Sequence, residues 1–597
     1  MYAPHLAAPG APVSPRMPSE RSFGTHDGES LFYRHWPATA AKRRGAIVLF
    51  HRGHEHSGRM AHLVDELQLP GFDFFAWDAR GHGRSPGERG YSPSFGTSVR
   101  DVQTFVDHIA SAHGIAHEDI FVVAQSVGAV LASSWAHDYA PKIRGLSLAS
   151  PAFKVKLYVP LARPGLALMH KLFGKFFVTS YVKAKFLTHD AERIRSYDAD
   201  PLITRPIAVN VLLGLYDAAD RVVADAQAIT LPTQLLISGA DWVVHQGPQQ
   251  RFYERLGSAV KEKVELPGFF HDTLGERDRA PAVRAVRAFI ERVFAAPPVR
   301  VDLRSAHTHG ATYDEARALA RPLPVLSPRG LYWAATRASL KLGGALSEGI
   351  RLGHATGFDS GSTLDYVYRD QARGVPLLGA LVDRQYLDSI GWRGIRQRKL
   401  HVEELLREAM HRVAVQSRPV RVMDIAAGHG RYVLDAVAGS PVPPNAVLLR
   451  DYSDINVRDG QRLIAEKNLQ DVARFIKADA FDRASLAATD PRPTVGVVSG
   501  LYELFSDNDM VARSLAGLAD AIAPGGMLVY TGQPWHPQLE LIARALTSHR
   551  QGEAWVMRRR TQAEMDQLVE AAGFAKIAQR VDEWGIFTVS LAVRVAP

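Results

Sequence analysis

The stretch from Phe121 to Val130, FVVAQSVGAV, constrains the fold more than any other part of the sequence. Phe121 to Ala124 predict a buried strand, and the run after Gly128 predicts a helix. Ser126 lies in the tight turn between them, as in a nucleophile elbow, where a strained turn exposes the hydroxyl above the sheet. The usual pattern is Gly-x-Ser-x-Gly, and Ala124 takes the place of the first Gly. On these residues alone, an ordinary turn between a strand and a helix is an equally good interpretation.

The length and composition indicate a globular protein with more than one domain. A chain of 597 residues is too long for a single hydrophobic core. Its hydrophobic fraction of 46% and charged fraction of 22% are typical of soluble globular proteins. The net charge of +9 is modest for this size, and no motif typical of nucleic-acid binding is present. We therefore expect small-molecule or lipid substrates and no nucleic-acid partner.

The sequence contains 0 Cys, which excludes disulfides, thiol nucleophiles and thiolate metal sites. We expect no metal and a cytoplasmic location. Residues 1–21 are rich in Ala and Pro but lack the basic and apolar regions of a signal peptide, so they predict a disordered leader. No uncharged apolar run approaches the ~20 residues that span a bilayer.

Residues 22–296 alternate strand-like and helix-like segments, which predicts an α/β sheet. A serine nucleophile in such a sheet needs an acidic residue and a histidine further along the chain, in that order. Asp241 follows the predicted strand TQLLIS, and His271 follows the strand KVEL and a Pro-Gly turn. Because each follows a strand, both side chains can meet Ser126 at the same edge of the sheet.

Residues 22–296 resemble the monoacylglycerol lipase and lysophospholipase branch of the α/β-hydrolases. The segments that carry the resemblance are EHSGR, WDARGHGRSPGERG, ADWVVHQGPQQRFYE and PGFFHD. It implies that Ser126 is the nucleophile, His271 the general base and then acid, and Asp241 the residue that orients His271. The oxyanion hole would come from the backbone N–H groups of Gly53 and Val127.

The sequence departs from this family at two positions and carries an unusually basic insertion. Arg52 replaces the Gly that usually opens the oxyanion loop, and Gln125 replaces the His before the nucleophile. We expect an active enzyme with an altered substrate preference or a lowered rate. Residues 152–230 predict a helical cap whose first part is basic and apolar. Such a cap is suited to peripheral contact with an anionic membrane, although an ordinary lid with solvated lysines is an equal alternative.

The second half predicts a nucleotide-binding α/β domain. Residues 297–330 predict a linker, 331–414 a helical subdomain, and 415–597 a Rossmann-like core. The segment MDIAAGHGRYV gives a strand, a glycine turn and a helix, in which Gly428 and Gly430 let the backbone approach a ligand. The turn lacks the Gly-x-Gly-x-x-Gly spacing expected of nicotinamide-binding proteins.

This region resembles the class I S-adenosylmethionine-dependent methyltransferase core, whose turn reads Asp-x-Gly-x-Gly-x-Gly. The resemblance implies S-adenosyl-L-methionine as cofactor, and it points to residues that end strands or form the glycine turn. These cofactor-binding candidates are Asp424, Ala426, Gly428, Gly430, Asp451 and Asp479. Candidates for contact with the methyl acceptor follow the fourth and fifth strands: Tyr502, Glu503, Trp535 and His536. His536 or Glu503 would be the base for an oxygen or nitrogen acceptor, whereas packing at the rim is the alternative for each.

We therefore predict a bifunctional enzyme. The first half would hydrolyse acylglycerol or lysophospholipid-like esters, and the second would transfer a methyl group to an unknown acceptor. The alternative is a lipid- or cofactor-binding scaffold in which one or both halves have lost their chemistry.

Overall fold

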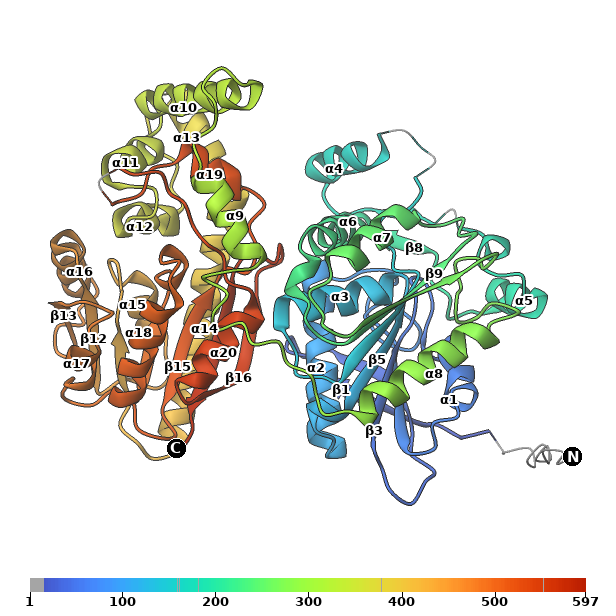
Figure 1. Cartoon of the computed structure of the whole chain (residues 1–597). Coiled ribbons are helices and arrows are strands. Elements are labelled where there is room, and N and C mark those ends of the chain that lie inside the picture. The colour runs from blue at the N-terminus through green and yellow to red at the C-terminus, as the bar shows by residue number, and fades with distance from the viewer. Residues whose placement is uncertain are drawn as a thin grey trace, which may run out of the picture. The chain divides into compact units, whose positions relative to one another are not determined.

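The computed structural model describes residues 15–596 except 158, 160, 181, 377 and 551, so most of the predicted leader lies outside the described residues. The chain forms two compact units, with the boundary between Val301 and Asp302. Each unit is built around its own central sheet (Figure 1). The predicted fold class, an α/β-hydrolase fold followed by a Rossmann-like fold, is confirmed.

The first unit contains an eight-stranded sheet in the order β1-β2-β4-β3-β5-β6-β9-β10. Its strands are β1 (Ser19–Gly24), β2 (Ser30–Trp36), β3 (Gly45–Phe50), β4 (Phe72–Trp77), β5 (Ile120–Gln125), β6 (Gly145–Ala149), β9 (Thr233–Ser238) and β10 (Lys261–Leu266). β1 and β2 are antiparallel to their neighbours, and the strands from β4 to β10 are parallel. Because parallel strands end at one edge, the loops after β3, β5, β9 and β10 converge there.

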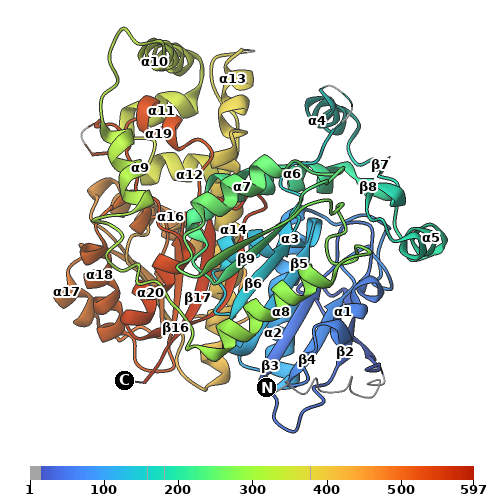
Figure 2. The same cartoon turned by 45° about the vertical axis from the view of Figure 1, so that its right-hand side comes forward.

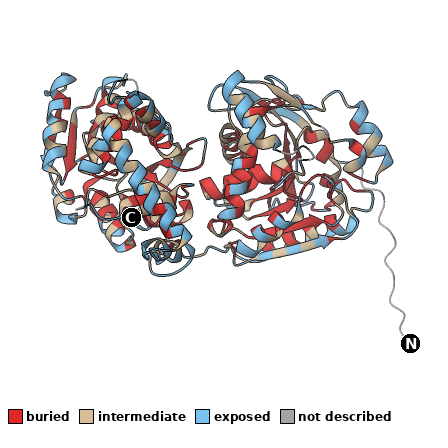
Figure 3. Cartoon of the chain, turned by 90° about the horizontal axis from the view of Figure 1, so that it is seen from above, coloured by how far each residue is buried: buried red, intermediate tan, exposed pale blue. Residues whose placement is uncertain are grey.

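Helices cover both faces of this sheet, as its apolar strands require. They are α1 (His62–Glu66), α2 (Phe95–His113), α3 (Val127–Tyr139), α7 (Gln246–Arg255) and α8 (Ala280–Ala295). β3, β4 and β5 are buried along their whole length. The buried side of α8, including Phe289 and Ile290, packs with Ile47 and Phe121 in one core cluster. Figure 3 shows the same division, with buried residues along the strands and exposed residues on the outer helix faces.

An insertion between β6 and β9 forms the cap. It contains α4 (Ala162–Phe173), β7 (Phe177–Thr179), α5 (Ala191–Ala199), β8 (Pro206–Ala208) and α6 (Val209–Ala224). β7 and β8 pair as a small antiparallel sheet, which the prediction of a helical cap did not include. Figures 1 and 2 show α4 standing beyond α6 at the margin of the first unit.

The second unit contains a seven-stranded sheet in the order β13-β12-β11-β14-β15-β17-β16. Its strands are β11 (Arg421–Asp424), β12 (Ala446–Asp451), β13 (Ala473–Lys477), β14 (Val495–Val498), β15 (Met527–Gly532), β16 (Phe574–Val581) and β17 (Thr588–Arg594). The strands from β13 to β15 are parallel, and β17 runs antiparallel to both of its neighbours. The strand order reverses between β11 and β14, which places a ligand crevice beyond the carboxyl ends of these two strands.

Helices of the second unit form a covering layer and a separate helical group. The covering helices are α14 (Ile390–Val415), α15 (Arg431–Ala438), α16 (Asp454–Glu466), α17 (Arg483–Ala487), α18 (Asn508–Ala521) and α20 (Gln562–Ala571). The group comprises α9 (Ala311–Ala320), α10 (Pro328–Leu346), α11 (Glu348–Thr356), α12 (Gly361–Arg369) and α13 (Leu378–Leu387), and α19 (Leu539–Ala545) packs against its helices α9 and α10. Figures 1 and 2 both show α10 to α13 gathered at one end of this unit.

Two predicted segment boundaries differ from the structure. The sequence predicts a leader that ends at residue 21, but β1 already begins at Ser19, because Ser19–Gly24 pairs along its whole length with β2. The predicted linker over residues 297–330 contains α9 and the start of α10. The sequence did not indicate these helices, because the segment is polar and contains Pro. Among the described residues, no helix is both long and apolar enough to cross a membrane.

Candidate active sites

Ser126 occupies a strained turn between β5 and α3. Its φ is 55°, in the left-handed region that a residue with a side chain rarely adopts. The backbone N–H of Ser126 donates to Ala149 O at 2.9 Å, which fixes the turn against β6. A Cβ on Gly128 would overlap the backbone carbonyl of His51, so only glycine allows α3 to pass this close to the end of β3. Strand, turn and helix therefore form the nucleophile elbow geometry.

His271 connects Ser126 to Asp241 through one hydrogen-bond chain. His271 Nε2 lies 2.7 Å from Ser126 Oγ, and Nδ1 lies 2.7 Å from Asp241 Oδ2. The other carboxylate oxygen of Asp241 accepts backbone N–H groups from Val243 at 2.7 Å and Val244 at 2.9 Å. The structure thus brings together the three predicted catalytic side chains from the loops after β5, β9 and β10.

Asp241 is held in its charged form. Burial alone would raise the pKa of this carboxyl, but the His271 ring and the hydrogen bonds from His271, Val244 and Val243 outweigh it and lower the pKa. A charged Asp241 keeps a proton on Nδ1 of His271, which leaves Nε2 free to accept the proton of Ser126. The geometry is that of a serine hydrolase.

The two predicted oxyanion-hole residues lie beside each other. Val127 is the first residue of α3, where a backbone N–H has no partner within the helix. A Cβ on Gly53 would come within 2.9 Å of Val127 Cγ2, so the loop after β3 approaches the start of α3 closely. Gly53, Val127, Ser126 and His271 line the same cavity.

The substituted residues Arg52 and Gln125 belong to a buried polar network behind the triad. Arg52 Nη2 donates to Glu55 at 2.7 Å, and Arg52 Nε lies 3.9 Å from Asp272. Gln125 donates its amide N–H to Asp272 at 2.7 Å and accepts the backbone N–H of Leu274 at 3.1 Å. Arg52 is therefore neutralised by carboxylates and is not a free cation beside the oxyanion hole.

The cavity above Ser126 is large and apolar. It has a volume of about 790 Å³. Most of its wall comes from aliphatic side chains of the cap and of the loop after β6, including Val155, Leu166, Met169, Leu212 and Leu215. Such a cavity is suited to a long hydrocarbon chain, because each buried CH₂ contributes about 0.8 kcal/mol.

The glycine turn of the second unit lies between β11 and α15. Gly428 and Gly430 have φ values of 57° and 76°, which favour glycine. Gly428 donates its backbone N–H to Asp451 Oδ2 at 3.0 Å, so the turn is bound to the end of β12. The adjoining cavity has a volume of about 710 Å³. It is lined by Ala426, Gly428, Gly430, Asp451 and Asp479, five of the six predicted cofactor residues.

Asp424 is the exception, because it is buried below the cavity and does not line it. Its Oδ1 accepts the backbone N–H of Ala426 at 3.1 Å, and the hydroxyl of the buried Tyr432 interacts with the same carboxylate. Burial raises the pKa of Asp424 to about 7. Asp424 therefore supports the glycine turn from beneath rather than facing a ligand directly.

The four predicted acceptor residues separate into two groups. Glu503 and His536 line a further cavity of this unit. Tyr502 and Trp535 line neither that cavity nor the one at the glycine turn, so their assignment to the acceptor site was wrong. Tyr502 is a core residue that donates its hydroxyl to Ser514 at 3.0 Å, and the Arg559 guanidinium lies over the ring of Trp535.

His536 is a hydrogen-bond donor rather than a base. Burial lowers its pKa to about 4, so the ring is neutral at pH 7. Its Nδ1 accepts the backbone N–H of Gln538 at 3.0 Å, which leaves the single ring proton on Nε2. Glu503, the other predicted base, lines the same cavity.

Sequence reasoning missed several residues of these cavities. Arg398 on α14 lines the same cavity as Glu503, but nothing in a helix rich in Arg and Lys indicates which of them faces inward. Asp365 on α12 and Arg431 form an ion pair beside the glycine turn. The segment that holds Asp365 also contributes several other residues between Thr356 and Tyr368 to the wall of this cavity.

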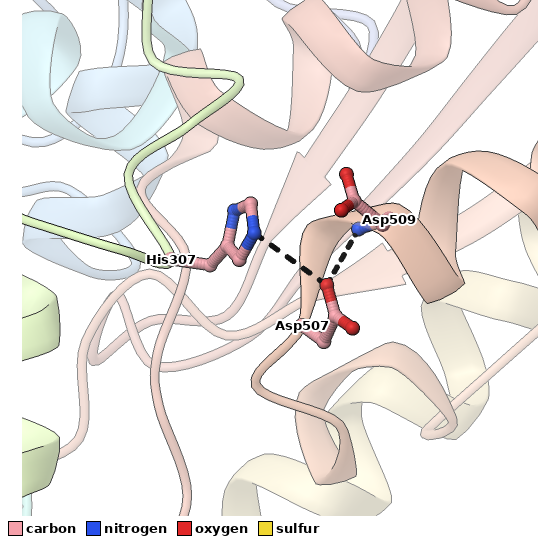
Figure 4. A group of neighbouring side chains, drawn as sticks. All are labelled: His307, Asp507 and Asp509. Atoms are coloured by element: carbon pink, nitrogen blue, oxygen red, sulfur yellow. Dashed lines mark hydrogen bonds and ion pairs between the residues drawn. The ribbon is translucent and has the colours of Figure 1, made fainter.

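A further cluster, His307, Asp507 and Asp509, has the donor types of a metal site (Figure 4). His307 Nε2 lies 3.6 Å from Asp507 Oδ1. The same Asp507 oxygen accepts the backbone N–H of Asp509 at 2.8 Å and so caps α18. Because this N-cap already accounts for the position of Asp507, the cluster is explained without an ion.

Comparisons with known proteins agree with this division. Residues 286–594 match the family described as "Putative methyltransferase", and residues 41–278 match the family described as "Serine aminopeptidase, S33". "Uncharacterized protein YnbC" of Escherichia coli is 58% identical over 580 residues, which cover 97% of this chain and 99% of that protein. Human "Monoglyceride lipase" is 30% identical over 226 residues, which cover 36% of this chain and 71% of that protein.

The first unit also has counterparts among solved structures. The monoacylglycerol lipase of Paleococcus ferrophilus is 23% identical, with a TM-score of 0.39, over 47% of this chain and 99% of that chain. A soluble variant of monoglyceride lipase from Saccharomyces cerevisiae is 20% identical, with a TM-score of 0.43, over 48% of this chain and 99% of that chain. The chain thus joins a hydrolase domain related to the monoglyceride lipases to a second domain, and it belongs, with YnbC, to the family described as "Putative methyltransferase".

Proposed function

We propose that the first unit is a serine ester hydrolase that acts on esters with a long apolar acyl chain, such as acylglycerols or lysophospholipids. One observation carries the proposal: the hydrogen-bonded chain Ser126–His271–Asp241 opens into an apolar cavity of about 790 Å³. The relationship to monoglyceride lipases supports the same substrate class.

The reaction follows from the positions of these groups. Ser126 Oγ attacks the ester carbonyl while His271 Nε2 takes its proton, and Asp241 stabilises the imidazolium that forms. The negative charge on the carbonyl oxygen is stabilised by the N–H groups of Gly53 and Val127. His271 then protonates the departing alcohol, and a water molecule activated by the same ring releases the acid.

The test compares the wild type with Ser126→Ala on p-nitrophenyl esters of short and long chains and on a monoacylglycerol. We expect the wild type to favour long chains and Ser126→Ala to lose at least about 10³-fold in kcat. Ser111→Ala, an exposed serine on α2, is the matched control and should behave as the wild type. Equal inertness of wild type and Ser126→Ala at every chain length would contradict the proposal.

For the second unit we propose S-adenosyl-L-methionine-dependent methyl transfer. The cavity of about 710 Å³ at the glycine turn fits this cofactor: the turn lets the backbone approach, and Asp451 provides a carboxylate for hydroxyl groups. Apolar side chains of Ile455 and Phe481 also line it and are suited to a flat base. When bound, S-adenosylmethionine supplies an activated methyl group, and the protein's own task is to hold and orient the two reactants.

Calorimetric titration with S-adenosylmethionine and S-adenosylhomocysteine tests the cofactor proposal directly. We expect both to bind the wild type and to bind Asp451→Ala at least about tenfold more weakly, which is about 1.4 kcal/mol. Asp471→Ala, an exposed aspartate of the same unit, is the control. Absence of heat from both ligands with the wild type would refute it.

We further propose that the cap contacts anionic membranes peripherally. α4 has no buried residue, and it or its flanks expose Leu161, Leu168, Leu172 and Phe173. Part of the basic charge is already paired, because Arg163 binds Asp217 and Asp220, and Lys175 binds Glu88. Apolar insertion should therefore contribute more to membrane binding than net charge does.

A further inference from the structure

A second cavity of the second unit lies directly beside the proposed cofactor cavity. It has a volume of about 380 Å³ and shares wall residues Asp359, Leu364, Gly500 and Leu504 with the larger one. Because the two cavities have walls in common, a molecule in one lies next to a molecule in the other. This is the position that a methyl acceptor must take.

The walls of this smaller cavity are mainly large apolar side chains. Ile350, Trp392, Ile395, Ile542, Trp555 and Phe587 all line it, and all belong to one buried hydrophobic cluster. They come from α11, α14, α19 and the segments before α20 and β17, so the helical subdomain and the core build the cavity together. A polar or charged acceptor would lose hydration here without finding partners along most of its length.

Among the described residues that line this cavity, only Glu503 has a buried carboxylate oxygen without a hydrogen-bond partner. Its side chain is 8% exposed, and Oε1 accepts the hydroxyl of Thr531 at 2.8 Å. Thr531 in turn accepts the backbone N–H of Gly500 at 2.9 Å, which ties Glu503 to a residue shared by both cavities. Its Oε2 is buried and has no hydrogen-bond partner among the described residues. An unpaired buried oxygen of this kind is suited to accept a hydrogen bond from a ligand.

Arg398 lies beside the Glu503 carboxylate and lines the same cavity. Its Nη1 is 3.8 Å from Glu503 Oε1, and its Nη2 would lie 3.0 Å from a Cβ on Gly500. Arg398 Nε and Gln533 Nε2 are buried donors without partners among the described residues, and His536 offers its Nε2–H. The polar side of the cavity thus combines one acceptor oxygen with several donors and has nearly balanced charge.

We propose that the methyl acceptor is a lipophilic molecule with a hydroxyl group, whose apolar part fills the smaller cavity and whose oxygen lies between Glu503 and Arg398. This inference rests on the proposed methyl transfer. A carboxylate would be repelled by Glu503 and an ammonium group by Arg398. A hydroxyl donates to Glu503 Oε2, and the negative charge that develops on its oxygen is stabilised by Arg398.

The step balances with groups already named. The O–H bond of the acceptor breaks and its proton passes to Glu503 Oε2. The oxygen forms a bond to the methyl group as the S–CH₃ bond of S-adenosylmethionine breaks, which yields the methyl ether and S-adenosylhomocysteine. Glu503 then returns the proton to solvent.

Acceptor binding can be measured without the cofactor, because Trp392 and Trp555 line the cavity. Tryptophan fluorescence of the full chain is titrated with decanol, 4-nonylphenol, decanoic acid, decylamine and the short analogue phenol. We expect the two long hydroxyl compounds to bind at least about tenfold more tightly than phenol and than the long acid or amine. Equal or tighter binding of decanoic acid or decylamine would overturn the hydroxyl assignment, and preference for phenol would overturn the lipophilic one.

The same compounds are then incubated with S-adenosylmethionine carrying a labelled methyl group. Glu503→Gln keeps the size of the side chain and its bond from Thr531, but it replaces Oε2 by an amide N–H₂ that cannot accept the ligand hydroxyl. We therefore expect weaker acceptor binding and, at saturating acceptor, a loss of about 10²–10⁴-fold in transfer. Glu553→Gln, an exposed glutamate, is the matched control and should retain the wild-type rate. An undiminished rate in Glu503→Gln would contradict its role as base. Failure of S-adenosylmethionine to bind in the calorimetric titration would refute the proposed methyl transfer, and the fluorescence titration would still decide which acceptor class the cavity takes.

Discussion

Gln125 donates its side-chain amide to Asp272 across 2.7 Å, which joins the residue before the nucleophile to the residue after the catalytic histidine. The same side chain accepts the backbone N–H of Leu274, so one buried amide holds the loop of His271 against the end of β5. Asp272 stays charged: burial opposes its ionisation, but Arg193 and Arg52 hold its pKa well below the usual range. Gln125 thus holds the loop of the catalytic histidine through hydrogen bonds from both ends of its amide.

Gln125→Leu tests this role, because leucine keeps the bulk but removes both hydrogen bonds. It leaves Leu274 N–H and Asp272 Oδ1 with one partner fewer in a buried site. We expect the free energy of unfolding to fall by about 1–3 kcal/mol and kcat for ester hydrolysis to fall with little change in KM. Denaturant titration and steady-state kinetics measure the two effects. Gln250→Leu on the solvent-facing side of α7 is the control, and an unchanged kcat in Gln125→Leu would show that the network does not position the triad.

The raised pKa of Asp424 predicts that the stability of the second unit depends on pH. Because the pKa of this carboxyl is raised to about 7, the folded protein keeps a proton that the unfolded chain releases above pH ~4. The stabilisation that the protonated Asp424 carboxyl gives the folded state is therefore fully present below pH ~4 and is lost as the pH rises to about 7. A shift of roughly three pKa units corresponds to at most about 4 kcal/mol.

We accordingly expect Asp424→Asn to gain stability relative to the wild type as the pH is raised from 5 to 8, by up to a few kcal/mol. Denaturant titrations of the full chain at both pH values measure the difference, and Asp471→Asn serves as an exposed control. A constant difference between wild type and Asp424→Asn across this range would rule out a titrating carboxyl at this position.

The sequence predicted best where local pattern and chain order carry the information. Ser126, Asp241 and His271 each follow a strand of a parallel sheet, so their convergence at one edge follows from topology. The same reasoning located the turn at Gly428 and Gly430. It failed for Tyr502, because a residue just after a strand can point either into the core or into the crevice, and the sequence does not say which.

Arg398 shows a second limit. It stands in a 26-residue helix with several other basic residues, and only tertiary packing turns it toward Glu503. The pairing of Arg52 with Asp272 could not be predicted either, because Asp272 lies more than two hundred residues further along the chain. The other partner of Arg52, Glu55, is near in sequence. Long-range pairing of buried charges depends on the folded arrangement and leaves no periodic signal in the sequence.

The exposed apolar side chains of α4 predict how the cap meets a bilayer. Leu172 and Phe173 are 66% and 73% exposed, which is unusual for residues of this type. We expect Leu172→Glu/Phe173→Glu to bind vesicles of phosphatidylcholine and phosphatidylglycerol at least about tenfold more weakly than the wild type, without loss of activity on a short, soluble ester. Vesicle flotation measures binding, and Val595→Glu at an exposed position far from the cap in sequence is the control. Equal flotation of wild type and double variant would exclude α4 as the contact.

Gly430 and Gly428 both have positive φ, but only Gly430 also lacks space for a side chain. A Cβ on Gly430 would overlap Leu449 Cδ1 on β12, whereas the nearest atom to a Cβ on Gly428 is Gly361 Cα at 3.5 Å. Both alanine variants should lose about 1–2 kcal/mol of stability from backbone strain. Gly430→Ala should lose a further ~1–3 kcal/mol because α15 must move away from β12.

Denaturant titration of the two variants gives the comparison, and Gly552→Ala, a positive-φ glycine with open space around it, is the control for strain alone. Combining Gly430→Ala with Leu449→Val isolates the steric part, because valine is shorter and relieves the overlap. We expect the double variant to be more stable than the sum of the single effects by about 0.5–2 kcal/mol. Strict additivity would mean that contact with Leu449 does not cause the requirement for glycine at position 430. Equal losses in Gly428→Ala and Gly430→Ala would mean that backbone strain alone causes the loss of stability.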